Sequence, residues 1–374
     1  MSIFDKIKRT YDWAISNLYV KPLLLKNLLR NKHLYDSSSY YPDKEARSKR
    51  QNFIFQVGQI IKYGLANEFY FMYGLDVKSD EERKEYMNYQ PFMIRRNYLN
   101  YEHNPHNSTC ILRNKLYFDI FANAIGITTP KIRAYYSNDT LYIWNDGFVK
   151  TSFDELLNFN DVELFCKETE GECGVGIFRL VIRNNKAYIE GLEISPKDLE
   201  TKIKGCEYIF QETVCQHPEM SRLYSGSINT MRLVTVRSLK DEKIHIMPSI
   251  LRIGAHGSFV DNTSQGGLAV GFDLNTGQLH KYGFYKPKFG LRTEVHPDSL
   301  VRLNEFYIPM LKDAEEKAIY FHTMLKDVHS IGWDIAIGRT GPIFIEGNDN
   351  WEINGPQVGN HGLKKEFEEY FFEK

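Results

Sequence analysis

Two apolar segments near the C-terminus, residues 331–337 and 342–346, are each interrupted by one carboxylate. The Gly-Arg-Thr-Gly sequence between them is typical of a turn, so the two segments are predicted to form an antiparallel hairpin. A charged side chain in a buried strand is costly unless it is paired or bound to a metal. Asp334 and Glu346 therefore constrain the fold of this chain more than any other residues do.

The hairpin predicts that Asp334 and Glu346 lie side by side, where they repel each other unless a divalent cation lies between them. Asn348 is two residues beyond Glu346 and projects from the same strand face. Two carboxylates and an amide oxygen form a hard-oxygen set that suits Mg²⁺, with nucleotide phosphates completing its coordination. Taken alone, the pattern also fits two acids at strand ends that face solvent.

A lysine and a glycine-rich loop form the second feature. Lys167 ends a predicted strand, and Gly171, Gly174 and Gly176 follow before another strand begins. Glycine amides can approach phosphate oxygens closely and the lysine adds a positive charge, so this segment is a candidate phosphate cover. It is neither a Walker loop, since no Gly-Lys-Ser/Thr opens a helix, nor a Rossmann turn, since a strand follows. An ordinary hairpin loop is the alternative.

Three weaker features lie between these two. An apolar strand ends in polar residues that could offer main-chain groups to an adenine edge: Gln211, Glu212 and Thr213. Arg232 and Arg252 each lie within an apolar run, where arginine usually meets a carboxylate or a phosphate. The Gly-Gly pair at 266–267 permits close backbone approach to a ligand. Each of these features, taken alone, also has an ordinary structural explanation.

Charge and cysteine content exclude several classes of protein. A net charge of −1 gives no overall field that favours nucleic acid. The five cysteines have no zinc-ribbon spacing and are expected to be reduced thiols in a cytosolic protein. Charged residues interrupt the N-terminus before any apolar run, and the longest apolar runs are too short for a membrane span. We therefore expect no signal peptide and a cytoplasmic location.

The first third of the sequence is basic and helical in pattern. Residues 1–65 contain 12 Lys and Arg against 5 Asp and Glu. Helices are predicted over 3–18, 21–34 and 44–75, the last with a possible break at Gly64. A basic amphipathic segment of this kind can lie on an anionic membrane surface. The alternative is a solvated helical face on a packed domain.

The rest of the sequence predicts an α+β fold. Helices are expected over 116–124 and 298–326. Strands are expected over 131–136, 140–144, 161–166, 177–183, 187–192, 207–212, 229–238, 243–252, 267–273, 279–282, 331–337 and 342–346. The chain is thus divided into a helical, basic region, 1–107, and a strand-rich region, 108–374.

The order of these features resembles that of the ATP-grasp superfamily over about residues 108–360. The sequences at 216–218, 227–232 and 260–267 are similar to those of the sugar-transfer-associated ATP-grasp proteins of polysaccharide gene clusters. The resemblance implies an ATP-grasp fold, in which two α+β lobes clasp ATP, preceded by the helical region. It further divides 108–374 into a lead-in at 108–155, a hinge lobe with the glycine-rich loop at 156–215, and a metal-binding lobe at 216–374.

The resemblance also assigns roles to individual residues. Lys167 and Lys115 resemble the ATP lysines, with Asn114 in place of a family Asp. Arg232 and Arg252 are similar to the arginines that hold an acyl phosphate and its tetrahedral successor. Asp334, Glu346 and Asn348 are similar to the Mg²⁺ ligands, which can also take Mn²⁺, and Gly347 departs from the Val or Ile often found there. The other residues implied in nucleotide binding are Gly171, Gly174, Gly176, Gln211, Glu212, Thr213, Asn229, Asn262, Gly266 and Gly267.

The activity implied is that of an ATP-dependent carboxylate–amine ligase that acts through an acyl phosphate. Its substrates would be a sugar acid or an amino acid in capsular or surface polysaccharide biosynthesis. His217 and His256 are candidates for the general base by residue type only. Two alternatives stay open: a kinase on the same scaffold, or a non-catalytic accessory protein. The accessory protein would contact a glycosyltransferase or the inner face of the membrane through residues 1–65.

Overall fold

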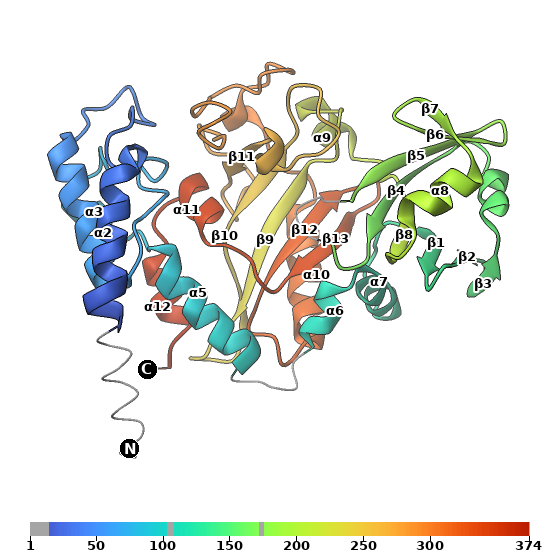
Figure 1. Cartoon of the computed structure of the whole chain (residues 1–374), viewed down its shortest axis with the longest axis horizontal. Helices are drawn as coiled ribbons and strands as arrows, with labels where there is room; N and C mark the ends of the chain where they lie inside the picture. The colour runs from blue at the N-terminus through green and yellow to red at the C-terminus, as the bar shows by residue number, and fades with distance from the viewer. Residues whose placement is uncertain (1–14, 103–107, 172–175, 374) are drawn as a thin grey trace, which may run out of the picture.

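The computed structural model describes residues 15–102, 108–171 and 176–373. Three parts lie side by side in Figure 1: an N-terminal group of helices at one end, a five-stranded sheet with its covering helices in the middle, and an eight-stranded sheet at the other end. The predicted α+β class, with a helical region before the strands, is confirmed.

The middle sheet is antiparallel and has the strand order β11-β10-β9-β12-β13. Its strands are β9 (Thr230–Arg237), β10 (Ile244–Ile253), β11 (Leu268–Gly271), β12 (Ser330–Ile337) and β13 (Pro342–Asn348). Successive side chains in a strand point to opposite faces. Leu233, Trp333 and Ile335 accordingly enter the main core, whereas Arg232 and Asp334 project from the other face.

Helices α7 (Lys115–Ala124) and α10 (Leu311–Met324) cover the core face of this sheet. Phe321 of α10 links the layers, with its ring centroid 5.4 Å from that of Phe118 and 4.7 Å from that of Trp333. The opposite face is covered only in part. The C-terminal segment, with α11 (Asn354–Gly359) and α12 (Lys364–Tyr370), packs Trp351 and Phe367 near Val234 and Val236. The remainder of that face is open to a cleft.

The eight-stranded sheet is also antiparallel, with the order β3-β2-β1-β8-β4-β5-β6-β7. Its strands are β1 (Ile132–Ser137), β2 (Thr140–Trp144), β3 (Phe148–Thr151), β4 (Val162–Glu168), β5 (Phe178–Arg183), β6 (Lys186–Ile189), β7 (Leu192–Ile194) and β8 (Tyr208–Glu212). Helix α8 (Pro196–Ile203) buries Leu199 and Ile203 against the separate core of this sheet. Short helices α6 (Thr109–Arg113) and α9 (Pro218–Leu223) lie near the junction with the middle sheet.

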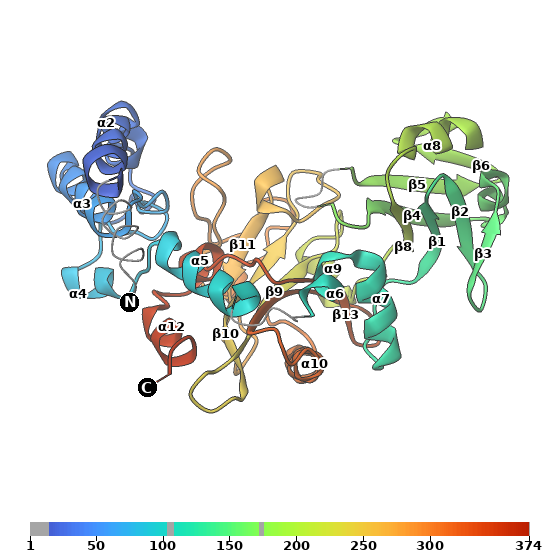
Figure 2. The same ribbon diagram turned by 60° about the horizontal axis from the view of Figure 1, so that its bottom comes forward.

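The N-terminal helices are α2 (Lys21–Arg30), α3 (Lys49–Tyr63), α4 (Asp80–Lys84) and α5 (Tyr89–Asn97). Figure 2 shows α2 and α3 at the end of the molecule opposite β1–β3. Phe92 of α5 joins the core of the C-terminal segment, with its ring 4.8 Å from Trp351 and 5.8 Å from Phe371. The helical region is therefore packed onto the middle sheet and its C-terminal cover. None of the helices within the described ranges is long and apolar enough to cross a membrane.

Most predicted elements are present, and four of those within the described residues differ. The helix predicted over 44–75 begins later, after a Ser48 capping box, and the break considered at Gly64 is confirmed, since Gly64 has a left-handed φ of 73° and ends α3. The strand predicted at 187–192 is interrupted by a turn at Glu190 and Gly191, both of positive φ. The strand predicted at 279–282 forms only isolated bridges. Most of the helix predicted at 3–18 lies outside the described residues.

The helix predicted over 298–326 is wrong for its first part. Residues 298–310 are irregular and the helix starts at Leu311. Pro309 disfavours a helical conformation at Ile308, and Met310 has a φ of 53°. Leu303 and Phe306 lie in this irregular segment and are fully buried. The burial of these loop residues gave the sequence the apolar spacing that is typical of a helix.

Candidate active site

A cleft of about 1330 Å³ runs between the two sheets. Strands β4 and β8 contribute residues from the eight-stranded sheet, and β9, β10, β12 and β13 contribute residues from the middle sheet. Of the site residues predicted from sequence, twelve line it: Lys115, Lys167, Gly171, Gln211, Glu212, Thr213, Arg232, Arg252, Asn262, Asp334, Glu346 and Asn348. Residues from both halves of the strand-rich region therefore face one space.

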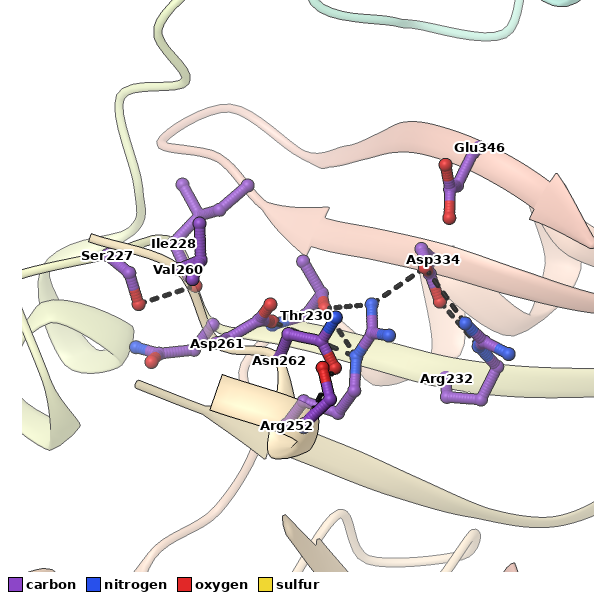
Figure 3. A network of polar contacts seen from close by, with 12 residues as sticks. Ser227, Ile228, Thr230, Arg232, Arg252, Val260, Asp261, Asn262, Asp334 and Glu346 are labelled. Carbon is purple, nitrogen blue, oxygen red and sulfur yellow. Dashed lines mark hydrogen bonds and ion pairs between the residues drawn. The ribbon is translucent and has the colours of Figure 1, made fainter. Parts of the chain in front are cut away.

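One row of paired residues crosses the middle sheet beneath the cleft. Glu346 of β13 pairs with Asp334 of β12, Asp334 pairs with Arg232 of β9, and Arg232 pairs with Ile250 of β10. Thr230 and Arg252 form the neighbouring row. Figure 3 shows the carboxylates and both arginines gathered on this face. The antiparallel register alone thus brings together residues that are more than a hundred positions apart in sequence.

Asp334 is buried and bound by both arginines. Arg232 donates from Nε to Oδ1 at 2.5 Å and from Nη2 to Oδ2 at 3.1 Å. The Nη2 of Arg252 is 2.7 Å from Oδ2. Burial opposes ionisation of Asp334, but the two guanidinium groups outweigh burial and hold its pKa below the ordinary value. Asp334 is therefore a carboxylate at any pH near neutrality.

Asp261 and Thr230 extend this network. Arg252 donates to Thr230 Oγ1 from Nε at 3.2 Å and from Nη2 at 2.9 Å. The Thr230 amide donates to Asp261 Oδ2 at 2.9 Å, and the Thr230 hydroxyl donates to the same oxygen. Burial raises the pKa of Asp261, and Arg252 opposes that rise. The network fixes Arg252 on two sides, which holds its guanidinium rigidly at the cleft.

Glu346 and Asn348 lie beside Asp334 in an arrangement that fits a divalent cation. The Asn348 amide nitrogen is 3.3 Å from Glu346 Oε1 and 3.3 Å from the Gly332 carbonyl oxygen. Burial and the neighbouring Asp334 carboxylate raise the pKa of Glu346. A cation between the two carboxylates would remove that repulsion. Within the described residues no three His, Cys, Asp or Glu side chains converge, so such a cation would need Asn348 and outside oxygens.

Two lysines reach the cleft from the other side. Lys115 is the first residue of α7, and its Nζ donates to the Gly171 carbonyl at 2.6 Å. Asn114 caps this helix by accepting hydrogen bonds from the Leu116 and Tyr117 amides. Lys167 projects from β4, and burial lowers its pKa against the opposing pull of Glu346. Both lysines line the cleft, and both lie close enough to Glu346 for their charges to interact with its carboxylate.

The strand end at Gln211, Glu212 and Thr213 lies at the same cleft. Its amides already have partners: Glu212 donates to the Lys131 carbonyl at 2.9 Å, and Thr213 donates to the Glu163 carbonyl at 3.2 Å. The Glu212 carboxylate forms a 2.6 Å ion pair with Arg133. The Glu212 and Thr213 amides therefore already donate within the protein, and the Glu212 carboxylate is paired with Arg133.

Four of the predicted nucleotide-binding residues do not line the cleft, and Gly174 lies outside the described residues. Asn229 is buried, and its Nδ2 donates to the Met220 and Tyr224 carbonyls. A Cβ at Gly267 would lie 2.4 Å from the Asp261 carbonyl oxygen, so that glycine permits close packing. Gly176 and Gly266 have left-handed φ values of 73° and 99° that shape their turns. These four residues therefore support the conformation or packing of neighbouring segments.

Sequence reasoning missed some cleft residues. Asp261 is adjacent to Asn262, and a buried acid beside a predicted ligand is a usable signal. Arg113 Nε is 2.9 Å from the buried Asp349 carboxylate, and both residues line the cleft. Asp349 directly follows Asn348, which is again a local signal. The two histidines proposed as bases, His217 and His256, are not among the residues that line the cleft.

Comparison with known proteins places these observations in a family context. Residues 94–370 match a family model described as sugar-transfer associated ATP-grasp. A search of curated proteins found no match. Similar solved structures include D-alanyl-alanine synthetase A from Vibrio cholerae, with 10% identity and a TM-score of 0.38, covering 69% of this chain and 64% of that one.

Two further solved structures show the same level of similarity. The D-alanine–D-alanine ligase from Helicobacter pylori has 11% identity and a TM-score of 0.40, covering 71% of this chain and 61% of that one. The N5-carboxyaminoimidazole ribonucleotide synthetase from Thermus thermophilus has 12% identity and a TM-score of 0.34, covering 64% of this chain and 45% of that one. This chain therefore spans less than two thirds of the length of each of these three proteins.

Proposed function

Because the chain belongs to the sugar-transfer associated ATP-grasp family, we propose that it is an ATP-dependent ligase that joins a carboxylate to an amine through an acyl phosphate. The observation that supports this most is the row Glu346, Asp334 and Arg232 beside Arg252. It places acidic oxygens for a cation next to fixed guanidinium groups for a carboxylate. Lys115 and Lys167 face the same space from the other side.

In the proposed first step, a carboxylate oxygen of the substrate attacks the γ-phosphorus of ATP. The bond to the β,γ-bridging oxygen breaks, and ADP leaves. Lys115 and Lys167 would neutralise phosphate charge. Glu346, Asn348 and Asp334 would hold Mg²⁺ or Mn²⁺, which would supply charge neutralisation at the phosphates when bound.

In the second step, a neutral amine attacks the carbonyl carbon of the acyl phosphate, and inorganic phosphate leaves. Arg252 would stabilise the oxyanion of the tetrahedral intermediate, since Thr230 and Asp261 hold its guanidinium in place. Arg232 would fix the carboxylate in the first step. The amine must lose a proton. Besides Asp334, the carboxylate nearest to Arg252 among the residues described above is that of Asp261, at 3.9 Å. Burial raises the pKa of Asp261.

The finer parts of the proposal concern substrates and location. We propose a sugar acid or an amino acid as the carboxylate, in capsular or surface polysaccharide biosynthesis; the family description, sugar-transfer associated, supports the link to sugars only. We also propose a cytoplasmic enzyme with peripheral contact to the inner face of the membrane, or to a glycosyltransferase, through residues 1–65. The division into a helical region, 1–107, and an ATP-grasp domain, 108–374, belongs to the same proposal.

The test is a screen of uronic acids, amino acids and nucleotide sugars, read by ADP release and mass spectrometry. Ligation requires that ADP and phosphate appear only when both a carboxylate and an amine are present, with a condensed product. A stable phosphorylated product from a single acceptor would instead identify a kinase and overturn the ligase proposal. Absence of Mg-ATP binding by calorimetry would leave the non-catalytic accessory protein.

A further inference from the structure

The end of the cleft beyond Arg232 is formed in part by the N-terminal helical region. Phe69 and Met72 line the cleft there, together with Ile250 of β10 and Phe284. Met72, Ile250 and Phe284 also belong to one apolar cluster, against which Phe69 packs. Phe69 and Met72 precede residues 94–370, which match the family model, so this wall includes a part of the chain outside that match.

The position of the wall relative to the arginines follows from strand register. Ile250 and Arg252 are two residues apart on β10 and both line the cleft, so their side chains lie about 7 Å apart on one face. Ile250 is also the cross-strand partner of Arg232. The row Glu346, Asp334, Arg232, Ile250 spans three strand spacings, or roughly 14 Å. The wall therefore lies beyond Arg232 and beside Arg252, on the side opposite the proposed cation site.

The wall is held in place by buried hydrogen bonds from the helical region to the segment that follows β11 and to α11. The Tyr40 hydroxyl donates to the Tyr285 carbonyl at 2.7 Å and accepts from the Tyr285 amide at 3.0 Å. The Tyr73 hydroxyl donates to Asn354 Oδ1 at 2.7 Å and accepts from Gln357 Nε2 at 3.0 Å. Tyr73 directly follows the 69–72 segment in sequence, and Tyr40 belongs to the same apolar cluster as Met72. The apolar surface is thus formed before a substrate arrives, which favours binding.

Polar groups surround this apolar surface. Lys286 and Glu352 are exposed and line the cleft, and Lys286 is two residues from Phe284 in sequence. A pyranose ring has apolar C–H faces and hydroxyl groups around its edge. An aromatic and aliphatic wall with polar groups at its rim matches both features. Met72, Ile250 and Phe284 are buried, so half-buried Phe69 presents most of the apolar surface, and a short amino acid held at the arginines would leave it uncovered.

We propose that Phe69 and Met72 form a specificity wall that selects a carboxylate carried on a sugar ring over a short-chain amino acid. This inference rests on the proposed function, because it places the reacting carboxylate at Arg232 and Arg252. It assigns the helical region a part in substrate recognition. Phe69 is a specificity residue here and takes no part in proton or phosphoryl transfer.

The test measures binding without turnover. The methyl glycosides of glucuronic, galacturonic and mannuronic acid, with D-alanine as the short-chain probe, are titrated in the presence of Mg²⁺ and a non-hydrolysable ATP analogue. Phe69→Ala is expected to weaken binding of at least one uronate roughly tenfold, about the effect of losing one aromatic contact with its buried area. Binding of the ATP analogue is expected to be unchanged. Phe71→Ala is the matched control, because Phe71 is in the same segment but does not line the cleft.

Phe69 also stacks on Tyr73 at 5.7 Å, so Phe69→Leu is included as a variant that keeps apolar volume. If Phe69→Ala loses binding of the ATP analogue as well, Phe69→Leu decides the question. The proposal then requires that Phe69→Leu binds the ATP analogue as the wild type does and binds the uronate more weakly, with a smaller loss than Phe69→Ala shows. The proposal is overturned if none of the three uronates binds, or if Phe69→Ala binds a uronate as the wild type does. It is also overturned if D-alanine binds as tightly as the best uronate. Failure of the wild type to bind the ATP analogue would instead refute the proposed function.

Discussion

Asp334 lies between two arginines and the carboxylate of Glu346, and its contacts with the arginines limit its availability to a cation. Its oxygens accept hydrogen bonds from Arg232 and lie within 2.7 Å of Arg252, while Glu346 is its neighbour on β13. Glu346 and Asn348 have fewer such contacts and offer the more available oxygens. We therefore expect Glu346 to be the residue on which cation binding depends most.

The first prediction is that Glu346→Gln abolishes ATP turnover and stabilises the protein without Mg²⁺. The raised pKa of Glu346 means that its ionised form is disfavoured in the fold, so removing the charge relieves a cost that is present above the unfolded pKa. We expect a loss of at least about 100-fold in ADP release and a gain on the order of 1 kcal/mol in unfolding free energy. Glu316→Gln, an exposed position on α10, is the control. Turnover at the wild-type rate would refute the cation assignment.

The second prediction concerns His322, which is buried in the main core. Its Nε2–H donates to the Val328 carbonyl at 2.9 Å, and its Nδ1 lies 2.8 Å from Thr235 Oγ1. Thr235 Oγ1 in turn accepts from Trp333 Nε1 at 2.8 Å. This arrangement satisfies a neutral imidazole, and burial lowers the pKa of His322 to about 3.

The unfolded chain binds a proton at His322 below about pH 6.5, and the folded protein does so only near pH 3. Stability contributed by neutral His322 is therefore lost as the pH falls from about 6.5 toward 3, with a limiting slope of about 1.4 kcal/mol per pH unit. Urea unfolding from pH 7 to 4.5 should show a steeper decline for wild type than for His322→Gln. The exposed His33→Gln should follow the wild type. Parallel curves for wild type and His322→Gln would contradict this.

At the residue level, sequence predicted best where one strand pair carries the signal. Asp334, Glu346 and Asn348 interrupt apolar strands that pair with each other, so their proximity followed from the pattern. Arg232 and Arg252 also needed the strand order, which only the folded sheet supplies. Asn229 does not line the cleft: its buried amide donates to the Met220 and Tyr224 carbonyls and to the Gln216 side chain, and a structural amide of this kind has the same sequence appearance as a ligand.

At the level of elements, local capping and turn signals were informative, and burial patterns were not always so. Helix α7 was predicted over 116–124 and begins one residue earlier, at Lys115, after its Asn114 cap. The segment 298–310 shows a helical spacing of apolar residues but folds as a loop, because Pro309 and the left-handed Met310 exclude a continuous helix. Long-range packing of Leu303 and Phe306 produced that spacing.

The third prediction compares two glycines in different elements. A Cβ at Gly271 of β11 would lie 2.1 Å from the Gly359 carbonyl oxygen, so Gly271→Ala must push α11 away from the sheet edge. We expect a loss of roughly 1–3 kcal/mol. Gly58 is exposed within α3 and has nothing within 4 Å of its Cβ position, so Gly58→Ala should gain up to about 1 kcal/mol through helix propensity. Chemical denaturation measures both, and equal effects of one sign would contradict the packing argument.

For the whole molecule, the sequence could not predict that the helical region would reach the cleft. Tyr40 and Tyr73 contact residues about 245 and 281 positions away in the chain, and no local pattern encodes such pairs. The basic composition of residues 1–65 was visible in the sequence, but the surface on which the basic side chains lie was not. The structure shows that Lys26 and Arg30 of α2 are exposed beside Leu23 and Leu29, which are 46% and 58% exposed.

The last prediction tests whether this face of α2 contacts a membrane. Apolar side chains beside basic ones suit the interface of an anionic bilayer, and each basic residue near such a surface contributes about 1 kcal/mol. Lys26→Gln with Arg30→Gln should therefore weaken binding to phosphatidylglycerol-containing vesicles roughly 30-fold in sedimentation, with little binding to phosphatidylcholine alone. Lys364→Gln with Lys365→Gln, on α12, is the matched pair and should bind as the wild type does. Equal losses from the two pairs would indicate a general charge effect, and no loss from either would leave α2 with a packing role only.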